Sequence, residues 1–70
     1  MGKRDRNRLR VLRAERRISQ MDTAAKSGVT VGRIWRIENG YDDPTPAERA
    51  ALAKFFRVDE QEIFPAAVAS

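Results

Sequence analysis

The side chains with the most useful chemistry lie close together in the middle of the chain. They fall within one stretch of seven residues and are Arg33, Trp35, Arg36 and Asn39. An arginine can donate two hydrogen bonds to the O6 and N7 atoms of one guanine. A tryptophan can pack on sugars and thymine methyl groups while its indole N–H reaches a phosphate. These residue types point to the recognition of a nucleic acid.

The composition excludes most catalytic chemistry. None of the 70 residues is histidine or cysteine, so the usual general base, the commonest metal ligand and a disulfide framework are missing. Asp42 and Asp43 are typical of a turn rather than a metal site. The charges of Asp59, Glu60 and Glu62 are typical of the start of a helix. No nucleophile is paired with a base. We therefore expect no enzyme activity, no catalytic residue, no cofactor and no metal site.

The charge is strongly asymmetric along the chain. Residues 1–17 contain eight basic and two acidic side chains, a net charge of +6, whereas residues 18–70 have a net charge of −2. A basic arm before a balanced body favours a polyanion as partner, although a solubilising terminus has the same pattern. The arm, predicted over residues 1–5, could reach phosphates or stay solvated. With no membrane-length apolar run and no secretory signal, we expect a cytoplasmic protein without a membrane partner.

Helical periodicity predicts five helices that position these side chains. The first covers about residues 6–17, the second residues 19–28 and the third residues 30–40. Ser19 and Thr30 are N-caps of the second and third helices, and a glycine at the end of each permits a left-handed stop. The apolar stripe of the first helix is formed by Leu9, Leu12 and, as an optional member, Val11.

Two further helices follow a loop. Thr45 is the N-cap of the fourth, a proline takes its first position, and Glu48 completes a capping box. Asp59 and Glu62 form a second such box over a short fifth helix, which a proline ends before a frayed tail at residues 66–70. The expected apolar stripe of the fourth helix comprises Ala50, Leu52, Ala53 and Phe56.

The segment over residues 19–40 has the spacing of a helix-turn-helix, whose second helix enters the major groove of DNA. Ala24 is small where the two helices must cross, and Gly28 can adopt the positive φ that the turn needs. Ile34 and Ile37 lie one turn apart and anchor the second helix of the unit to the core. An ordinary αα-hairpin in a helical bundle has the same spacing, so further residues must distinguish the two.

Those further residues resemble the Cro/repressor (Xre-type) helix-turn-helix family of bacterial and phage transcription regulators. The resemblance implies an all-α, five-helix, lambda-repressor-like DNA-binding domain, here over residues 6–65, that usually binds operator DNA as a two-fold dimer. The matching residues are Leu9, Leu12-Arg13, Ile18-Ser19-Gln20, Ala24, Gly28-Val29-Thr30, Ile34, Ile37-Glu38-Asn39-Gly40, Pro44, Val58 and Ile63-Phe64.

The resemblance also implies roles for single residues. An arginine of the first helix pairs in this family with a glutamate at the end of the third, which implies a partly buried ion pair between Arg13 and Glu38. The alternative is that Arg13 faces solvent or DNA. The family glutamine matched by Gln20 contacts a phosphate and braces the third helix. Thr23 and Arg57 depart from the family, which typically has a core leucine and a glycine there, but Thr23 could bond a carbonyl one turn earlier.

The inward direction of Ile34 and Ile37 fixes which side of the third helix faces outward, at about 100° per residue. That side carries Gly32, Trp35, Arg36 and Asn39. Arg36 is the best candidate for reading a base. Gly32 has no side chain to read with and could instead allow a close approach to the groove. Trp35 could equally pack on DNA, on the domain's own surface or on a partner subunit.

We predict that eight residues bind DNA. Gln20 and Thr30 would contact phosphates beside helix N-termini, whose free N–H groups and dipoles favour anions. Arg33 would contact a phosphate, and Val31 a thymine methyl group. The full set is Gln20, Thr30, Val31, Gly32, Arg33, Trp35, Arg36 and Asn39.

The pattern and the resemblance together predict a sequence-specific DNA-binding transcriptional regulator, a repressor of prokaryotic or phage type. Its expected partner is double-stranded operator DNA, bound by a homodimer. One alternative is a DNA-binding antitoxin or accessory factor that also contacts a protein partner. Another is a protein-interaction adaptor that kept the fold and lost the groove contact. Substitution of Arg36 distinguishes the adaptor from the two DNA-binding alternatives, because only a DNA reader would lose sequence preference.

Overall fold

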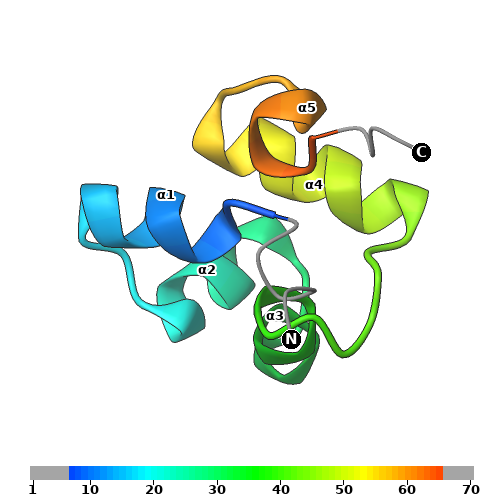
Figure 1. Ribbon diagram of the computed structural model, residues 1–70. Helices are drawn as coiled ribbons and strands as arrows, with labels where there is room; N and C mark the ends of the chain where they lie inside the picture. Colours follow the sequence, from blue (N-terminus) through cyan, green and yellow to red (C-terminus); the bar gives the residue numbers. More distant parts are fainter. Residues whose placement is uncertain (1–6, 66–70) are drawn as a thin grey trace.

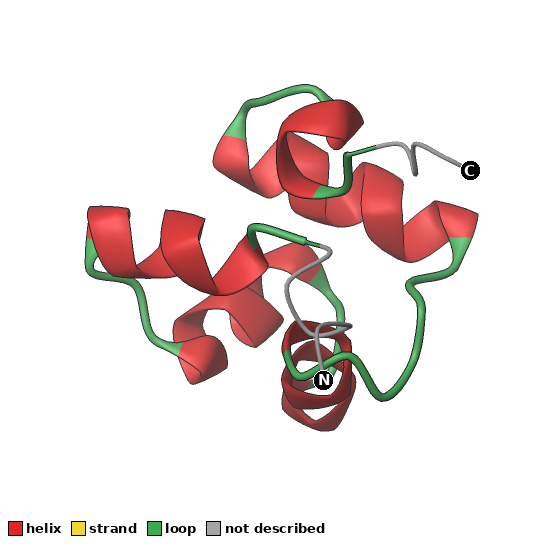
Figure 2. Ribbon diagram, in the orientation of Figure 1, coloured by secondary structure: helices red, strands yellow, loops and turns green. Residues whose placement is uncertain are grey.

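The computed structural model describes residues 7–65, which form five helices and no strand (Figures 1 and 2). This confirms the predicted all-α fold. The predicted basic arm at residues 1–5 and the predicted tail at residues 66–70 lie outside the described residues. The helices are α1 (Leu9–Arg16), α2 (Gln20–Ser27), α3 (Val31–Glu38), α4 (Pro46–Phe56) and α5 (Glu60–Ile63).

The helices surround one apolar core. α2 packs against α3 and α4, and α4 packs against α5. Figure 1 shows α3 nearly end-on, apart from the pair formed by α4 and α5, with the α3–α4 loop running along the outside of the molecule. One face of α3 is therefore left for other contacts. The buried apolar side chains are Leu9, Leu12, Val29, Ile34, Ile37, Leu52, Ala53, Phe56 and Ile63.

Local capping signals set most of the helix ends. The hydroxyls of Ser19, Thr30 and Thr45 accept hydrogen bonds from the backbone N–H three residues later, at 2.9, 3.3 and 3.1 Å. The Glu48 carboxylate accepts one from the Thr45 N–H at 2.9 Å, which confirms the capping box of α4. Gly28 ends α2 with φ of +85°, as the turn requires.

Three details of the predicted caps and apolar stripes are wrong. The Asp59 side chain caps nothing, because the Glu62 N–H already donates to the Asp59 backbone carbonyl at 2.9 Å. Ala50 is exposed, because the buried residues of α4 fall three, four and seven places after Arg49 and so define a different face. Val11 is 44% exposed and takes no part in the core.

α1 begins at Leu9 rather than near residue 6. The Asn7 side chain accepts a hydrogen bond from the Leu9 N–H at 3.0 Å and donates one to the Ile37 carbonyl at 3.0 Å. Asn7 therefore starts α1 and ties it to the end of α3, a role that no local pattern indicates.

The two departures from the family pattern are accommodated differently. Thr23 is fully buried, and its hydroxyl donates to the Ser19 carbonyl at 2.9 Å, as predicted. Arg57 ends α4 with φ of +60°, the left-handed conformation that a glycine would adopt without strain. For a non-glycine residue this conformation costs roughly 1–2 kcal/mol.

Candidate nucleic-acid interface

α2 and α3 form a helix-turn-helix unit. The Gly28 N–H donates to the Ala24 carbonyl at 3.0 Å, and two residues later Thr30 caps the next helix. Ala24 is half-buried against the core, as the crossing of two helices requires. The turn is short because glycine reverses the chain in one step and Thr30 restarts the helix at once.

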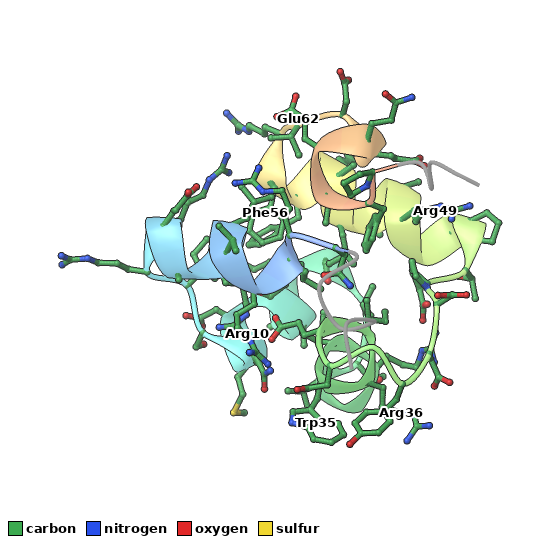
Figure 3. The ribbon with its side chains drawn as sticks, in the orientation of Figure 1. Arg10, Trp35, Arg36, Arg49, Phe56 and Glu62 are labelled. Atoms are coloured by element: carbon green, nitrogen blue, oxygen red, sulfur yellow. The ribbon has the colours of Figure 1, made fainter. Side chains whose placement is uncertain are left out.

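α3 has one buried and one exposed face. Ile34 and Ile37 are fully buried, so they fix the helix to the core. Figure 3 shows Trp35 and Arg36 directed away from the body of the molecule. Val31 and Gly32 are exposed near its beginning. This division matches the helical wheel at every one of these positions.

Asn39 lies at the edge of the exposed face rather than at its centre. Its side-chain N–H donates to the Trp35 carbonyl at 2.8 Å, and its side-chain oxygen accepts from Arg10 at 3.0 Å. The amide therefore closes the last turn of α3 and links it to α1.

A buried charge cluster holds the inward face of α3 at its C-terminal end; it consists of Glu38, Arg13 and Gln20. Arg13 donates twice to the Glu38 carboxylate, from Nε at 2.5 Å and from Nη2 at 3.1 Å. Gln20 donates to the same carboxylate at 3.0 Å. The predicted ion pair is confirmed, and Gln20 braces the third helix as the family resemblance implies. Since these partners come from α1, α2 and α3, the cluster fixes the orientation of α3.

A second charge cluster lies on the outer side of α3; it consists of Arg33, Arg36, Asp42 and Glu48. Arg33 donates to both carboxylate oxygens of Glu48, at 2.8 and 2.7 Å. It also donates to Asp42 at 2.9 Å and to the Asp43 backbone carbonyl at 3.2 Å. Hydrogen bonding to Glu48, followed by the charges of Glu48 and Asp42, raises the pKa of Arg33, and hydrogen bonding by Arg33 lowers the pKa of Glu48. Arg33 therefore joins α3 to the start of α4, a link that sequence reasoning missed.

Aromatic and charged side chains meet on the exposed face of α3, near its C-terminal end. The ring of Tyr41 stacks on Trp35 with centroids 5.2 Å apart, and the Arg36 guanidinium lies 5.7 Å from the Tyr41 centroid. Trp35 thus leans on the domain's own surface and stays 46% exposed. Tyr41 is 62% exposed and was not among the predicted residues. Its only sequence signal is an aromatic residue just after a helix-stop glycine.

In the part of the chain that the structure describes, no helix is long and apolar enough to cross a bilayer. No group of three or more acidic side chains in residues 7–65 is placed to hold a metal ion.

Comparison with known proteins identifies the unit. The model of a family described as a helix-turn-helix domain matches residues 6–63. An uncharacterised HTH-type transcriptional regulator of Methanocaldococcus jannaschii is 40% identical over 58 residues, covering 83% of this chain and 88% of that protein. The restriction-modification controller protein C.AhdI of Aeromonas hydrophila has a similar crystal structure, with a TM-score of 0.79 and 26% identity over 89% of this chain and 94% of that one. The chain belongs to the helix-turn-helix family of DNA-binding transcriptional regulators, as its resemblance to the Cro/repressor (Xre-type) regulators predicts.

Proposed function

We propose that the protein is a repressor that binds a specific operator by placing α3 in the major groove. The observation that carries this proposal is the row of exposed side chains on α3, held rigid from behind by Ile34, Ile37 and the buried charge cluster. A helix fixed in this way presents the same groups to every operator, which sequence readout requires. A regulator of this type would work on prokaryotic or phage DNA in the cytoplasm.

Each exposed residue has a proposed role on DNA. Arg36 would read guanine, because an arginine can donate to O6 and N7 together. Val31, 41% exposed, would contact a thymine methyl group, and Trp35 would pack on sugars from its stack with Tyr41. Gly32 would allow the helix backbone to approach the groove closely.

The remaining predicted residues would position the protein. Thr30 and Gln20 lie at the starts of α3 and α2, where backbone N–H groups favour a phosphate. Arg33 and Asn39 already use most of their hydrogen-bonding groups within the protein. We assign them supporting roles at the edge of the interface, where Arg33 would add positive charge near a phosphate.

We propose that two copies bind a two-fold symmetric operator with half-sites roughly 34–36 Å apart, about one turn of DNA. A monomer presents a single α3, whose few exposed side chains can read only a short sequence. Two copies would double the number of base pairs read and match the symmetry of the duplex. The likeness to C.AhdI makes control of a restriction-modification system one setting to test.

Selection from a random DNA library tests this proposal. We expect a preferred sequence in which two half-sites are related by two-fold symmetry. Arg36→Ala should reduce preference for one guanine per half-site by roughly ten- to a hundredfold, whereas Lys54→Ala, an equal loss of charge on α4, should weaken all sequences slightly. If the protein selects no sequence, or if Arg36→Ala leaves DNA affinity unchanged, an adaptor that binds a protein partner becomes the better reading.

A further inference from the structure

We propose that Asp42 is a positioning residue that sets the sequence specificity of Arg36. The proposal rests on the function proposed above and adds a residue outside α3 to the reading of the operator. Asp42 lies in the α3–α4 loop, and it would hold the Arg36 guanidinium by one edge so that the opposite edge meets a guanine.

The loop folds back onto the end of α3. The backbone N–H groups of Tyr41 and Asp42 both point at the Arg36 carbonyl, at 2.9 and 3.4 Å. This path returns the Asp42 carboxylate to the side chain of the same arginine. Its Oδ2 accepts a hydrogen bond from Arg36 Nε at 2.6 Å. The contact between Asp42 and Arg36 therefore follows from the way the backbone turns at the end of α3.

Asp42 is itself held in place. The same Oδ2 accepts from Arg33 Nη1 at 2.9 Å, and Arg33 is bound through two bonds to Glu48 at the start of α4. Hydrogen bonding by Arg36, more than any other cause, lowers the pKa of Asp42. The carboxylate is therefore ionised at neutral pH and acts only as an acceptor.

The geometry leaves the reading edge of Arg36 open. A guanidinium has five N–H donors, and the bond to Asp42 uses the Nε donor. Within residues 7–65, neither terminal nitrogen of Arg36 makes a hydrogen bond, and the side chain is 49% exposed. These two nitrogens can donate together to O6 and N7 of guanine. On its other side, the Tyr41 ring limits where the guanidinium can move.

Holding Arg36 in this way has two consequences for binding. The side chain loses less freedom when it meets its base, so the specific contact gains strength. The nearby negative charge also reduces the attraction of Arg36 for phosphates in general. Asp42 would thus weaken binding to unrelated DNA and strengthen the preference for the operator.

Asp42→Asn tests the proposal against Asp43→Asn, which removes an equal charge from the adjacent residue. Asp43 is exposed, and among the described residues its side chain makes no hydrogen bond or ion pair. We expect both variants to bind unrelated DNA more tightly by similar factors. Asp42→Asn alone should lose about two- to tenfold of the preference for the guanine that Arg36 reads, as the cost of ordering one side chain implies.

Two results would overturn the proposal. One is an Asp42→Asn variant with the same guanine preference as Asp43→Asn. The other is an equal effect of Asp42→Asn with Arg36→Ala already present, because a positioning residue has nothing to position once the arginine is gone. If even the unaltered protein shows no sequence preference, the proposed function fails instead.

A measurement without DNA tests the positioning of Arg36 independently of the proposed function. Proton exchange of the Arg36 Nε–H, followed by nuclear magnetic resonance, should be slow in the native protein and in Asp43→Asn, and fast in Asp42→Asn. Should Asp42→Asn not fold, the exchange rate in the native protein, compared with that of Arg57, decides alone. Exchange as fast as that of the exposed Arg57 under native conditions would contradict the proposal.

Discussion

The two charge clusters on either side of α3 use the same residue types for different purposes. In the buried cluster the Glu38 side chain is inaccessible and Arg13 is 16% exposed. In the outer cluster Asp42 and Arg36 are 36% and 49% exposed. Solvent screens the Arg36–Asp42 pair far more than the Arg13–Glu38 pair, so burial decides whether a pair of charges fixes the fold or arranges a surface.

Burial also explains how each cluster is satisfied. Glu38 receives donors from Arg13 and Gln20, with Arg10 at 3.7 Å, because a buried carboxylate left short of partners would be costly. Asp42 is 36% exposed and keeps contact with water, so the loss of one partner costs it less than it would cost Glu38. The outer cluster can therefore position a side chain for DNA at the surface, whereas the inner one fixes the fold.

The largest expected effect is on the buried cluster. Glu38→Gln should lower the free energy of unfolding by ~3–5 kcal/mol, because it leaves the Arg13 charge without its counterion. Urea unfolding at pH 7 measures this loss. The control is Glu15→Gln on α1, whose carboxylate is 60% exposed and lies 3.9 Å from Arg8. A loss no larger than that of the control would break the comparison.

A smaller loss is expected where the outer cluster joins α4. Glu48→Gln keeps an oxygen that can accept from the Thr45 N–H, but it loses the paired, charge-assisted hydrogen bonds from Arg33. This loss should lower the free energy of unfolding by ~1 kcal/mol. Thermal unfolding beside the exposed control Glu62→Gln measures it. A loss as large as that of Glu38→Gln would show that the outer cluster is structural as well.

Gly32 lies on the exposed face of α3 and, having no side chain, takes part in neither charge cluster. A Cβ built there meets no atom within 4 Å, so Gly32→Ala should stabilise the fold by about 0.5–1 kcal/mol. If the variant is more stable but binds operator more weakly, the missing Cβ serves the approach to DNA. An unchanged operator affinity would remove Gly32 from the proposed interface.

The smallest expected effect is on how the free energy of unfolding changes with pH, through the carboxylates of the outer cluster. The pKa values of Asp42 and Glu48 are lowered in the folded state, so their contribution is present above the unfolded values near pH 4 and is lost as pH falls through the folded ones. Unfolding experiments between pH 6 and pH 2 should show less acid destabilisation in Glu48→Gln than in the native protein. Salt at 1 M should weaken the difference.

Sequence reasoning succeeded where a signal is local. Ser19, Gly28 and Thr30 set the turn between two helices by their own capping and conformational preferences, so the helix-turn-helix could be predicted from spacing. The predicted capping box at Asp59 was wrong, because the Asp59 backbone carbonyl accepts the N–H that its side chain was expected to bind. The prediction that Ala50 is buried was wrong, because a four-residue stripe with two alanines does not define a helix face uniquely.

Sequence reasoning missed contacts that depend on how the α3–α4 loop travels. Arg33 meets Glu48 fifteen positions away, and Tyr41 turns back to stack on Trp35. Nothing in the intervening residues specifies that path. Asn7, which joins α1 to the carbonyl of Ile37, was missed for the same reason.

The sequence by itself determined the helices, the turn and the outward face of α3, because these depend on backbone preferences and a fixed period of rotation. The Arg13–Glu38 pair came from family resemblance and was confirmed by the structure. Only the tertiary structure decided which arginines use their N–H donors within the protein and which keep N–H donors free for a ligand. That outcome depends on distances between side chains from separate elements, so it exists only once the loop has brought Asp42 and Tyr41 back to Arg36.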